Sequence, residues 1–374
     1  MRRKHQYIHG RPDWSKFRWD REKLATPLAS VRHQQGRLIG HMDALGFPLQ
    51  QEAVLQTLTE DVVNSSEIEG EKLDASQVRS SLARRLGLDV GGLEAADHRV
   101  EGVVDMMLDA TRHYDQPLSA EKLFGWHASL FPAGRSGMRT IRVGAWRDDS
   151  TGPMQVVSGL IGRERVHFEA PAAANIEREM QVFLDWFNED GTNDTDPVLK
   201  AGLAHLWFAT IHPFDDGNGR IARAIADLAL ARSEQSPRRF YSMSAQIRQE
   251  RTAYYDILEQ TQTGTMDVTL WMEWFLACLG RAIDGAQTTL AGVLSKARFW
   301  QALRAVPLNE RQRLMLNCLL DRFEGKLTTS KWAKIAKCSS DTALRDILDL
   351  VDRGILVRNP EGGRSTSYAL AEVP

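Results

Sequence analysis

The feature that most constrains the fold is a pair of apolar helical stretches joined by a short polar loop. Residues 197–214 and 220–232 place apolar side chains three and four positions apart, which is the period of a helix. Pro213 prevents easy continuation of the first stretch. The sequence therefore predicts a helix–loop–helix unit with the segment IHPFDDGNGRIAR, residues 211–223, at its turn.

Most of the remaining chain is also helical in pattern. The stretches 25–47, 53–70 and 176–189 show apolar residues at the same spacing. One region differs, because 154–159 and 165–171 are short, rich in β-branched or aromatic residues, and joined by LIGRE. We therefore expect an all-α fold with one small β-hairpin.

Length and charge limit the classes of function. A chain of 374 residues suggests two or three domains with a sizeable core. With 47 Lys and Arg against 49 Asp and Glu, the net charge of −2 gives no overall excess for nucleic acid or an anionic membrane, so any such contact would be local. No stretch reaches the roughly 18 uninterrupted apolar residues of a membrane span, and no apolar segment follows the basic N-terminus. We expect no membrane partner.

The cysteines indicate a reducing compartment. Cys278, Cys318 and Cys338 lie far apart and form no CxxC pair. This spacing speaks against a zinc site and is typical of buried thiols. We therefore expect a cytoplasmic protein.

Two changes of pattern suggest domain boundaries. The clearer one lies near 285–309, where the helical body gives way to a shorter unit of different pattern. A softer one lies near residue 50. We predict three parts, which are an N-terminal helical domain (1–50), a main helical domain (51–285), and a linker helix with a C-terminal domain (286–374).

The loop between the two apolar helices has the composition of a phosphate site. Gly217 and Gly219 let the backbone turn and bring its N–H groups close to a ligand, at the positive end of the following helix. Arg220 and Arg223 lie three apart on the first helical turn, so both can face one ligand, and their guanidinium groups suit phosphate oxygens. Two arginines suggest more than one phosphate. Asp216 would repel phosphate unless a hard cation bridges them, which predicts Mg²⁺.

His212 is the candidate general base of this loop. Its ordinary pKa range allows an imidazole to accept a proton from a hydroxyl. Taken singly, a histidine after an apolar helix is more often a packed or capping residue, and GNG is usually a turn. The ordered combination of all these residues favours the functional interpretation.

That ordered set, H-P-F-x-D-G-N-G-R-x-x-R, resembles the signature of the Fic (filamentation induced by cAMP) family and matches it at every defined position. The resemblance implies an all-α Fic fold over 51–285. It also implies transfer of AMP from ATP to a Ser, Thr or Tyr hydroxyl of a target protein, with release of pyrophosphate. The branch of the family that phosphorylates its target carries a lysine where this chain has Gly219, so AMP transfer is favoured.

By that likeness, the loop supplies a base, a metal ligand and a set of phosphate contacts. His212 would deprotonate the target hydroxyl, Asp216 would bind Mg²⁺, and Phe214 would anchor the loop in the core. Asp215 falls at a variable position of the signature and receives no role. The phosphate contacts would be Asn218 with the backbone of Gly217 and Gly219 for the α-phosphate, and Arg220 and Arg223 for the β- and γ-phosphates.

A second informative stretch is NSSEIEGE, residues 64–71. Ser65 and Glu69 continue the apolar face of the preceding helix, and Gly70 is a candidate helix stop. A carboxylate there lies near the negative end of the helix dipole and needs a partner, although a solvated glutamate before a capping glycine would look the same.

The spacing Ser65-x-x-x-Glu69-Gly70 resembles the [S/T]xxxE[G/N] inhibitory motif of Fic proteins in which the inhibitory helix, here about 53–70, precedes the Fic core. The resemblance implies that Glu69 pairs with Arg223 and prevents ATP from seating its γ-phosphate. In some relatives the same glutamate helps to remove AMP, so both reactions stay open.

Two further segments receive roles by likeness. The hairpin at 154–171 resembles the Fic flap, which docks a target segment by strand-like pairing and presents its hydroxyl to the catalytic histidine. Any surface hairpin would show the same pattern. In the stretch 244–258, Tyr254 or Tyr255 would border the adenine, although aromatic residues at helical spacing are more often core.

The two ends of the chain resemble accessory domains. Residues 7–20 resemble the small N-terminal domain of many bacterial Fic proteins. The C-terminal part resembles a winged helix, with three helices followed by a two-stranded wing whose tip carries Gly362 and Gly363. Residues 326–370 hold eight Lys and Arg against five Asp and Glu, which permits DNA contact, but Asp341 and Asp346 on the presumed recognition helix oppose it.

Two functional classes follow. The first is a protein adenylyltransferase using ATP and Mg²⁺, acting on a target protein or on itself and restrained by Glu69. The alternative is a nucleotide-sensing regulator that binds DNA through the winged helix, and the C-terminal domain could instead dock a partner. A homodimer is an expectation by likeness to the family.

Overall fold

The computed structural model describes residues 7–88, 94–150, 152–158, 165–189, 195–320, 323, 325–359 and 366–371, without the side chains of 288 and 289. These residues form two compact units. The first comprises Met1–Gly87 and Glu94–Thr289, and the second comprises Leu88–Leu93 and Leu290–Pro374. The residues on both sides of the predicted boundary at 50 therefore belong to one unit, while the change of unit at 289 lies close to the predicted boundary at 285.

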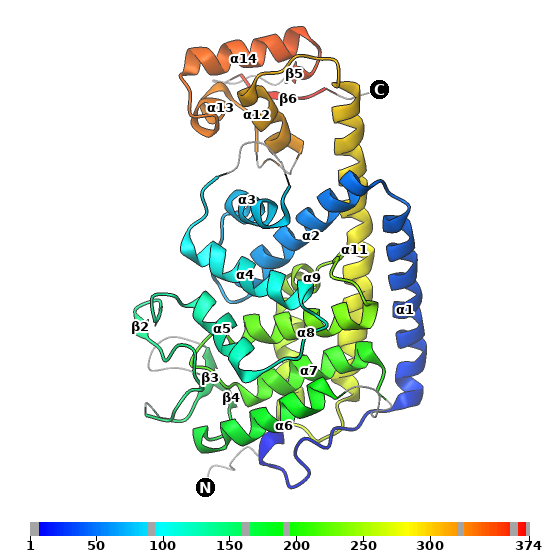
Figure 1. Cartoon of the computed structure of the whole chain (residues 1–374), viewed down its shortest axis with the longest axis vertical. Coiled ribbons are helices and arrows are strands. Elements are labelled where there is room, and N and C mark those ends of the chain that lie inside the picture. Colours follow the sequence, from blue (N-terminus) through cyan, green and yellow to red (C-terminus); the bar gives the residue numbers. More distant parts are fainter. Residues whose placement is uncertain are drawn as a thin grey trace. The chain divides into compact units, whose positions relative to one another are not determined.

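The first unit is a helical assembly with two small antiparallel strand pairs (Figure 1). The strands are β1 (Arg135–Ser136) with β2 (Arg139–Thr140), and β3 (Gln155–Ser158) with β4 (Arg165–Glu169). Its short 3-10 helices are η1 (Ile8–Gly10) and η2 (Ala173–Asn175). Its helices are α1 (Arg21–Asp43), α2 (Phe47–Ile68), α3 (Ala75–Leu86), α4 (His98–Arg112), α5 (Ala120–Leu130), α6 (Ile176–Asn188), α7 (Pro197–Ile211), α8 (Asn218–Glu234), α9 (Met243–Gln249) and α10 (Arg251–Gln262), followed by α11 (Thr269–Ala302), which continues past the change of unit.

The predicted helices are all present, with shifted ends. The helix α1 begins at Arg21 instead of residue 25 because the Asp20 side chain caps it by accepting from the N–H groups of Glu22 and Lys23. The helix α2 begins at Phe47 instead of residue 53 because Pro48 suits the first helical turn. The predicted hairpin is also present as β3 and β4, and its connecting residues 159–164 lie outside the described residues.

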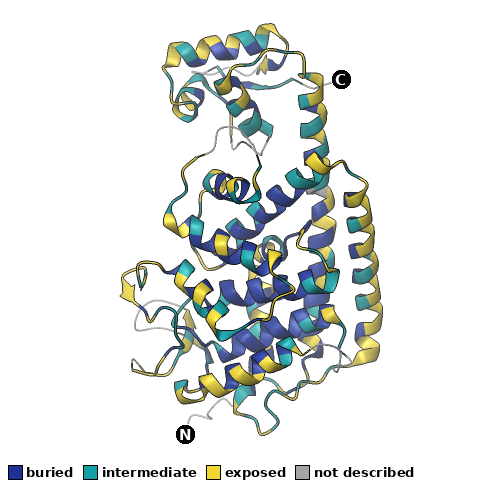
Figure 2. Cartoon of the chain, in the orientation of Figure 1, coloured by how far each residue is buried: buried dark blue, intermediate teal, exposed yellow. Residues whose placement is uncertain are grey.

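The helix pair α7 and α8 forms the centre of the core. Every residue from 201 to 211 and from 220 to 231 is buried, and Figure 2 shows these helices in dark blue. A helix that is buried on all sides needs apolar or internally paired residues around its whole circumference, which the LAHLWFATI segment supplies. The loop between them, where the candidate site lies, is therefore held by two rigid elements.

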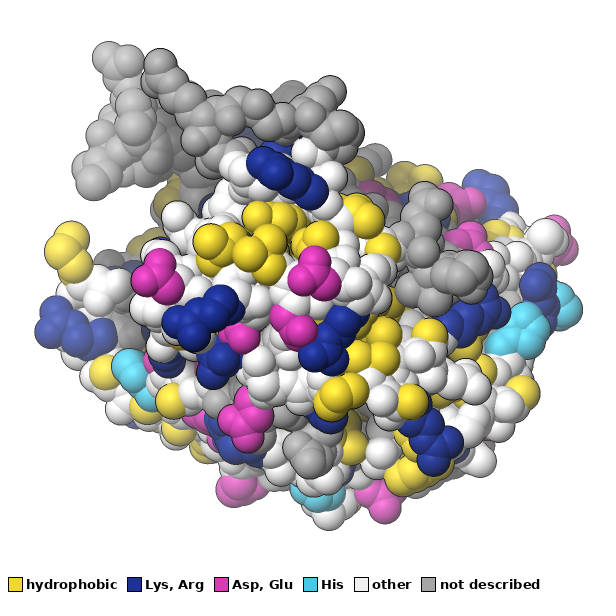
Figure 3. Space-filling view, turned by 90° about the horizontal axis from the view of Figure 1, so that it is seen from above, with side chains coloured by type: hydrophobic (Ala, Val, Ile, Leu, Met, Phe, Trp, Pro, Cys, Tyr) yellow, Lys and Arg dark blue, Asp and Glu magenta, His cyan; other side chains and the backbone are white. Residues whose placement is uncertain are grey.

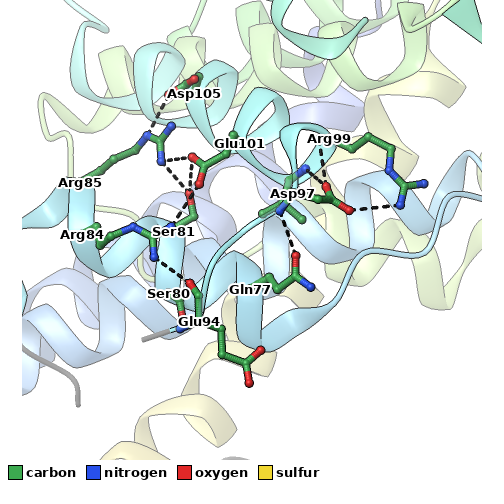
Figure 4. Close-up of polar contacts among 11 residues, drawn as sticks. Gln77, Ser80, Ser81, Arg84, Arg85, Glu94, Asp97, Arg99, Glu101 and Asp105 are labelled. Atoms are coloured by element: carbon green, nitrogen blue, oxygen red, sulfur yellow. Dashed lines mark hydrogen bonds and ion pairs between the residues drawn. The ribbon is translucent and has the colours of Figure 1, made fainter. Parts of the chain in front are cut away.

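The helix α3, which follows α2, is fastened to α4 by a charged network (Figure 4). Arg85 pairs with Glu101 and with Asp105, the latter at 2.8 Å, and Arg84 lies 3.1 Å from Glu101. Ser81 also donates to Glu101 at 2.9 Å. Exposed pairs contribute about 0.2–1 kcal/mol each, so the network supports the position of the chain after α2 without dominating its stability.

The second unit has its own core. Its helices are α12 (Glu310–Leu320), α13 (Thr329–Ile335) and α14 (Ser340–Asp352), and β5 (Leu356–Arg358) pairs antiparallel with β6 (Tyr368–Leu370). Trp332, Ile347 and Leu350 are fully buried in this core. The order of three helices and two strands is the predicted one, and the predicted wing tip with Gly362 and Gly363 lies outside the described residues.

The helix α14 differs from the expected recognition helix. Asp346 is 6% exposed and accepts from Arg311 at 2.7 Å and Asn309 at 2.9 Å, so it faces the core and not a ligand. The solvent face of α14 instead exposes Leu344 and Leu348. In the described part of the face shown in Figure 3, charged side chains of both signs surround a hydrophobic patch.

Two smaller expectations can also be checked. Cys278 is buried, whereas Cys318 and Cys338 are only partly buried, and all three are free thiols. Among the described helices, none combines the length and the apolar character that a bilayer crossing requires.

Candidate active site

The turn after α7 presents His212. This residue ends the helix in the left-handed conformation, with φ 52° and ψ 58°, and its N–H donates to the carbonyl of Phe208 at 3.0 Å. Phe214 follows and is fully buried, with its ring stacked on His127 at a centroid distance of 4.2 Å. Phe214 therefore anchors the loop in the core, as predicted.

The Asn218 side chain closes the loop by bonding to the backbone of Phe214. Its side-chain oxygen accepts from the Phe214 N–H at 3.0 Å, and its side-chain nitrogen donates to the Phe214 carbonyl at 2.8 Å. The residue is 2% exposed. The amide therefore shapes the turn, and the contact of Asn218 with an α-phosphate stays a prediction.

Gly217 caps the start of α8 in a conformation that favours glycine. Its φ is 81°, and a Cβ at this position would lie 2.9 Å from Phe131 Cε2. The first N–H groups of α8 have no acceptor within the helix and carry its positive end. The loop thus leads into the positive end of a helix, and the binding of phosphate there stays a prediction.

Glu69 lies directly against that end. Its Oε1 atom is 2.8 Å from Arg223 Nη2, so the predicted pair is present. A Cβ added to Gly219 would come within 2.0 Å of the same Glu69 oxygen. The carboxylate therefore occupies the space above the first turn of α8, where an anionic ligand would also bind.

Ser65 and Gly70 complete the end of α2. Arg223 donates from Nε to the Ser65 hydroxyl at 2.9 Å and from Nη2 to the Ser65 carbonyl at 2.8 Å. Gly70 has φ 84° and follows the last helical residues, as a helix stop should. Ser65 is fully buried, but the Glu69 side chain is 31% exposed, because Glu69 lies just beyond the helix and not on its buried face.

A second acidic residue, Glu71, pairs with the other motif arginine. Its Oε2 lies 2.7 Å from Arg220 Nη1, and the Arg220 guanidinium lies 5.1 Å from the centre of the Phe131 ring. Sequence reasoning missed Glu71, although a second carboxylate two positions after Glu69 was a visible signal. Both arginines that could bind phosphate therefore carry an acidic partner.

His212 is held in the neutral state. Burial lowers the pKa of His212 to about 4, and the charge of Arg147 adds to this effect, while the Ala209 carbonyl, Glu69 and Asp216 oppose it. Nδ1 lies 3.2 Å from the Ala209 carbonyl oxygen, which can only accept, so Nδ1 carries the proton. Nε2 then holds the lone pair, which is the state required of a base.

Asp216 is a single carboxylate at the edge of the loop. One of its oxygens accepts from the Gly217 N–H at 2.6 Å, and the other accepts from the Ser136 hydroxyl. Within the described residues, no group of three or more His, Cys, Asp or Glu side chains could hold a metal ion. A cation here would therefore need most of its ligands from a nucleotide and from water, which is the way Mg²⁺ usually binds.

Three residues outside the motif also contact the loop and were missed from sequence. Ser136 bonds Asp216, and the backbone N–H of Arg142 donates to Asp215 at 2.8 Å. The guanidinium of Arg147 donates from Nε to the His212 carbonyl at 2.8 Å. All three lie in the segment before the hairpin, and no local pattern links them to the motif.

The two candidate adenine contacts differ. Tyr254 is 2% exposed, and its hydroxyl lies 2.9 Å from His205 Nε2, so it is a core residue in this conformation. Tyr255 is half-buried, with its ring 5.5 Å from the Arg251 guanidinium. The stretch 244–258 is broken at Glu250 into α9 and α10, and both tyrosines lie on α10.

The hairpin of β3 and β4 presents an exposed apolar surface. Val157 is 49% exposed and Val166 is 42% exposed. On its inner side, Phe168 is buried against Tyr7 at a ring distance of 5.1 Å, and the Glu169 carbonyl is bonded to His9 at 2.7 Å. The N-terminal segment therefore braces β4 of the hairpin.

Two family models match this chain. Residues 7–88 match a domain of unknown function (DUF4172), and residues 117–230 match the Fic/DOC family. The first model covers both the N-terminal segment and the helix that carries Glu69. The second covers the loop motif.

Curated relatives match over parts of their length. The protein adenylyltransferase Fic of Nematostella vectensis is 34% identical over 123 residues, which cover 32% of this chain and 27% of the relative. The protein of the same name from Drosophila mojavensis is 26% identical over 226 residues, or 60% of this chain and 40% of the relative. The chain thus spans well under half the length of these relatives.

Solved structures share the fold. A Fic family protein from Desulfovibrio desulfuricans G20 has a TM-score of 0.52 at 19% identity, covering 94% of this chain and 96% of that protein. A Fic domain containing signaling protein from Bacteroides thetaiotaomicron has a TM-score of 0.52 at 20% identity, covering 70% and 97%. The match of the family model identifies residues 117–230 as a domain of the Fic/DOC family, and the two solved structures share the fold.

Proposed function

We propose that this chain is a protein adenylyltransferase that transfers AMP from ATP to a Ser, Thr or Tyr hydroxyl of a target protein. The observation that carries the proposal is the neutral His212, with Nε2 free to accept a proton, on a turn that leads directly into the anion-binding end of α8. The names of the curated relatives support the same reaction class.

The nucleotide phosphates bind at the first turn of α8. Asn218 and the backbone N–H groups of Gly217 and Gly219 contact the α-phosphate, after the Gly217 N–H leaves Asp216. Arg220 and Arg223 contact the β- and γ-phosphates. Asp216 would hold Mg²⁺ together with phosphate oxygens and water, after one of its oxygens leaves Ser136. When bound, the cation would neutralise negative charge on the phosphates.

The transfer step needs one proton acceptor. His212 Nε2 takes the proton of the target hydroxyl as its oxygen attacks the α-phosphorus of ATP. The new bond is a phosphodiester between target oxygen and AMP, and the bond from the α-phosphorus to the bridging oxygen breaks, so that pyrophosphate leaves. Positioning and charge stabilisation supply most of the catalysis in such a step.

The target segment docks along the 154–171 hairpin. Val157 and Val166 give it an exposed apolar surface, and strand-like pairing would fix the depth of the hydroxyl relative to His212. A hydroxyl of this same chain is a second acceptor under this proposal.

Glu69 holds the enzyme inactive in this conformation. Its carboxylate lies against Gly219, where it repels the terminal phosphates, and it is paired with Arg223, which would otherwise bind one of them. Glu71 extends the block to Arg220. ATP must therefore displace two carboxylates from two arginines before its phosphates can seat. The same Glu69 is the residue that would activate water if the chain also removes AMP.

The position of a labelled phosphate in ATP distinguishes AMP transfer from transfer of the γ-phosphate. Purified Glu69→Gly protein, alone and in cell lysate, is incubated with Mg²⁺ and with ATP labelled at either the α- or the γ-phosphate. Label retained from α-labelled ATP and absent from γ-labelled ATP is the expected result. Label retained from γ-labelled ATP would identify a kinase, and no retained label from either would refute transfer.

The alternative, a DNA-binding regulator, gains no observation from the described residues. The solvent face of α14 exposes Leu344 and Leu348, with the acidic Asp341 and the basic Arg345 also exposed. A gel-shift titration with random duplex DNA at rising salt is its test, because phosphate contacts weaken steeply with salt.

A further inference from the structure

The segment between β2 and β3 sends one arginine into the base of the catalytic turn. Arg147 is 3% exposed and belongs to none of the sequence motifs discussed above. A buried guanidinium carries five N–H donors and no acceptor, so it must be surrounded by oxygens. The oxygens around Arg147 come from both sides of the candidate site.

On the side of the turn, Arg147 binds two consecutive carbonyls. Its Nε donates to the His212 carbonyl at 2.8 Å, and its backbone N–H donates to the Pro213 carbonyl at 2.9 Å. These carbonyls follow the end of α7 and have no partner within the helix. The contact also fixes the backbone of a non-glycine residue that is held at φ 52°.

On the side of the hairpin, Arg147 binds the segment that leaves β4. Its Nη2 donates to the Pro171 carbonyl at 2.5 Å, and its Nη1 lies 3.2 Å from Asp149 Oδ1. The other oxygen of Asp149 accepts from the Ala173 N–H at 2.8 Å. A single guanidinium thus spans the catalytic turn and the end of the target-docking hairpin.

We propose that Arg147 is a positioning residue that fixes the hairpin and the His212 turn relative to each other. The target hydroxyl is carried by a segment on the hairpin, whereas the base is carried by the turn. Their separation therefore depends on the contacts that Arg147 makes with both, which we call the clamp. A misplacement of about 1 Å can cost a reaction about 100-fold in rate. The rate effect rests on the proposed function, but the clamp itself does not.

The matched control is Arg232, which makes the same kind of contact elsewhere. It donates to the carbonyls of Tyr114 at 2.6 Å, Gln116 at 2.8 Å and Phe187 at 3.3 Å. It lies in the last turns of α8, about 22 Å along the helix from the end of the catalytic loop at Gly217, at about 1.5 Å per residue. R232Q removes a comparable set of hydrogen bonds without touching the turn or the hairpin.

The first test needs no target protein. Hydrogen exchange is followed by mass spectrometry in peptides covering 205–216 and 165–175 of the E69G protein, with R147Q, R147K or R232Q added. R147Q should speed exchange on the order of tenfold in both peptides, and R232Q in neither. Unchanged exchange in both peptides for R147Q would overturn the clamp. If R147Q does not fold, R147K replaces it in this test, because its single ammonium keeps the charge but cannot reach the carbonyls of both His212 and Pro171.

The second test separates positioning from general stability. The initial rate of AMP incorporation into the protein and lysate acceptors should fall about 100-fold in E69G/R147Q, while the Kd for Mg·ATP, measured by calorimetry, stays within about twofold of E69G. E69G/R147K should be nearly as slow. Full activity of the lysine variant, or an equal loss in E69G/R232Q, would refute a positioning role. If E69G itself transfers no AMP, the proposed reaction fails, and hydrogen exchange still decides the clamp.

Discussion

Removing the Glu69 carboxylate should strengthen ATP binding and weaken the fold at the same time. The carboxylate is 31% exposed, whereas its partner Arg223 is buried and also bonded to Ser65. A pair of this kind lies between an exposed one, worth about 0–1 kcal/mol, and a fully buried one, whose disruption costs about 3–5 kcal/mol. Because solvent screens the Glu69 side of the pair, we expect the loss of the pair to cost about 1–2 kcal/mol of free energy, which is a factor of about 5–30 in an equilibrium constant.

The two effects have opposite signs. In the free protein, E69Q leaves Arg223 without its counter-charge, so the free energy of unfolding should fall by about 1–2 kcal/mol. In the complex, ATP no longer has to displace the carboxylate, so the Kd for Mg·ATP should fall by about 5–30-fold. A general loosening of the fold would lower both stability and affinity.

Urea unfolding and titration calorimetry measure the two quantities. The matched control is E67Q, because Glu67 pairs with Arg248 at 2.5 Å from the same end of α2 without touching the loop. E67Q should leave the Kd for Mg·ATP within about twofold of wild type. An E69Q protein that binds Mg·ATP no more tightly than wild type, or an equal gain in E67Q, would refute the reasoning.

Three further predictions follow from the same site. E71Q should tighten Mg·ATP binding about 3–10-fold by freeing Arg220, and should add to E69Q in calorimetry; the absence of any gain would show that Glu71 does not restrain the site. N218A removes both bonds to Phe214 and should lower the free energy of unfolding by about 1–3 kcal/mol in urea, whereas a loss below about 0.5 kcal/mol would mean that the loop holds its shape without this amide. The ring signals of His212 in an NMR titration should change with a midpoint near the lowered pKa of about 4, and a midpoint near 6.5 would contradict a buried neutral base. Because the unfolded chain binds that proton from about pH 6.5, the free energy of unfolding should fall as pH drops from 6.5 towards 4, and H212Q should reduce this slope.

The loop and its two helices could be predicted because their determinants are local. The helical period of 197–214 and 220–232, Pro213 and the glycines specify the turn within one short segment. The Glu69–Arg223 pair joins residues 154 positions apart, and only the resemblance to a known motif linked them. The structure then showed the contact that the resemblance implied.

The supporting residues could not be predicted because their roles depend on tertiary contacts. Arg147 is one of many arginines in the sequence, and its contacts with His212 and Pro171 exist only after the hairpin packs beside the turn. Asn218 belongs to the motif, yet its side chain bonds the loop backbone. The sequence left Tyr254 open between an adenine contact and a core position, and only the packing, with its hydroxyl bonded to buried His205, shows that it is a core residue.

Helix ends were predicted less well for a different reason. Capping of α1 by Asp20 and the placement of Pro48 in the first turn of α2 both lie outside the apolar pattern that locates a helix. The predicted boundary at 285 falls inside α11, which continues to Ala302 although the compact unit changes at Thr289. The apolar period identifies the body of a helix, while single capping residues and prolines decide where it begins.

The most direct test of the central claim is the intact mass of purified wild type, E69G and E69G/H212A after incubation with Mg²⁺ and ATP in the presence of cell lysate, with lysate proteins analysed in parallel. The account predicts adenylyl groups on E69G or on lysate proteins incubated with it, and none above background with wild type or with E69G/H212A. Equal modification by E69G and E69G/H212A would contradict His212 as the base, and no adenylyl group with any of the three would contradict AMP transfer itself.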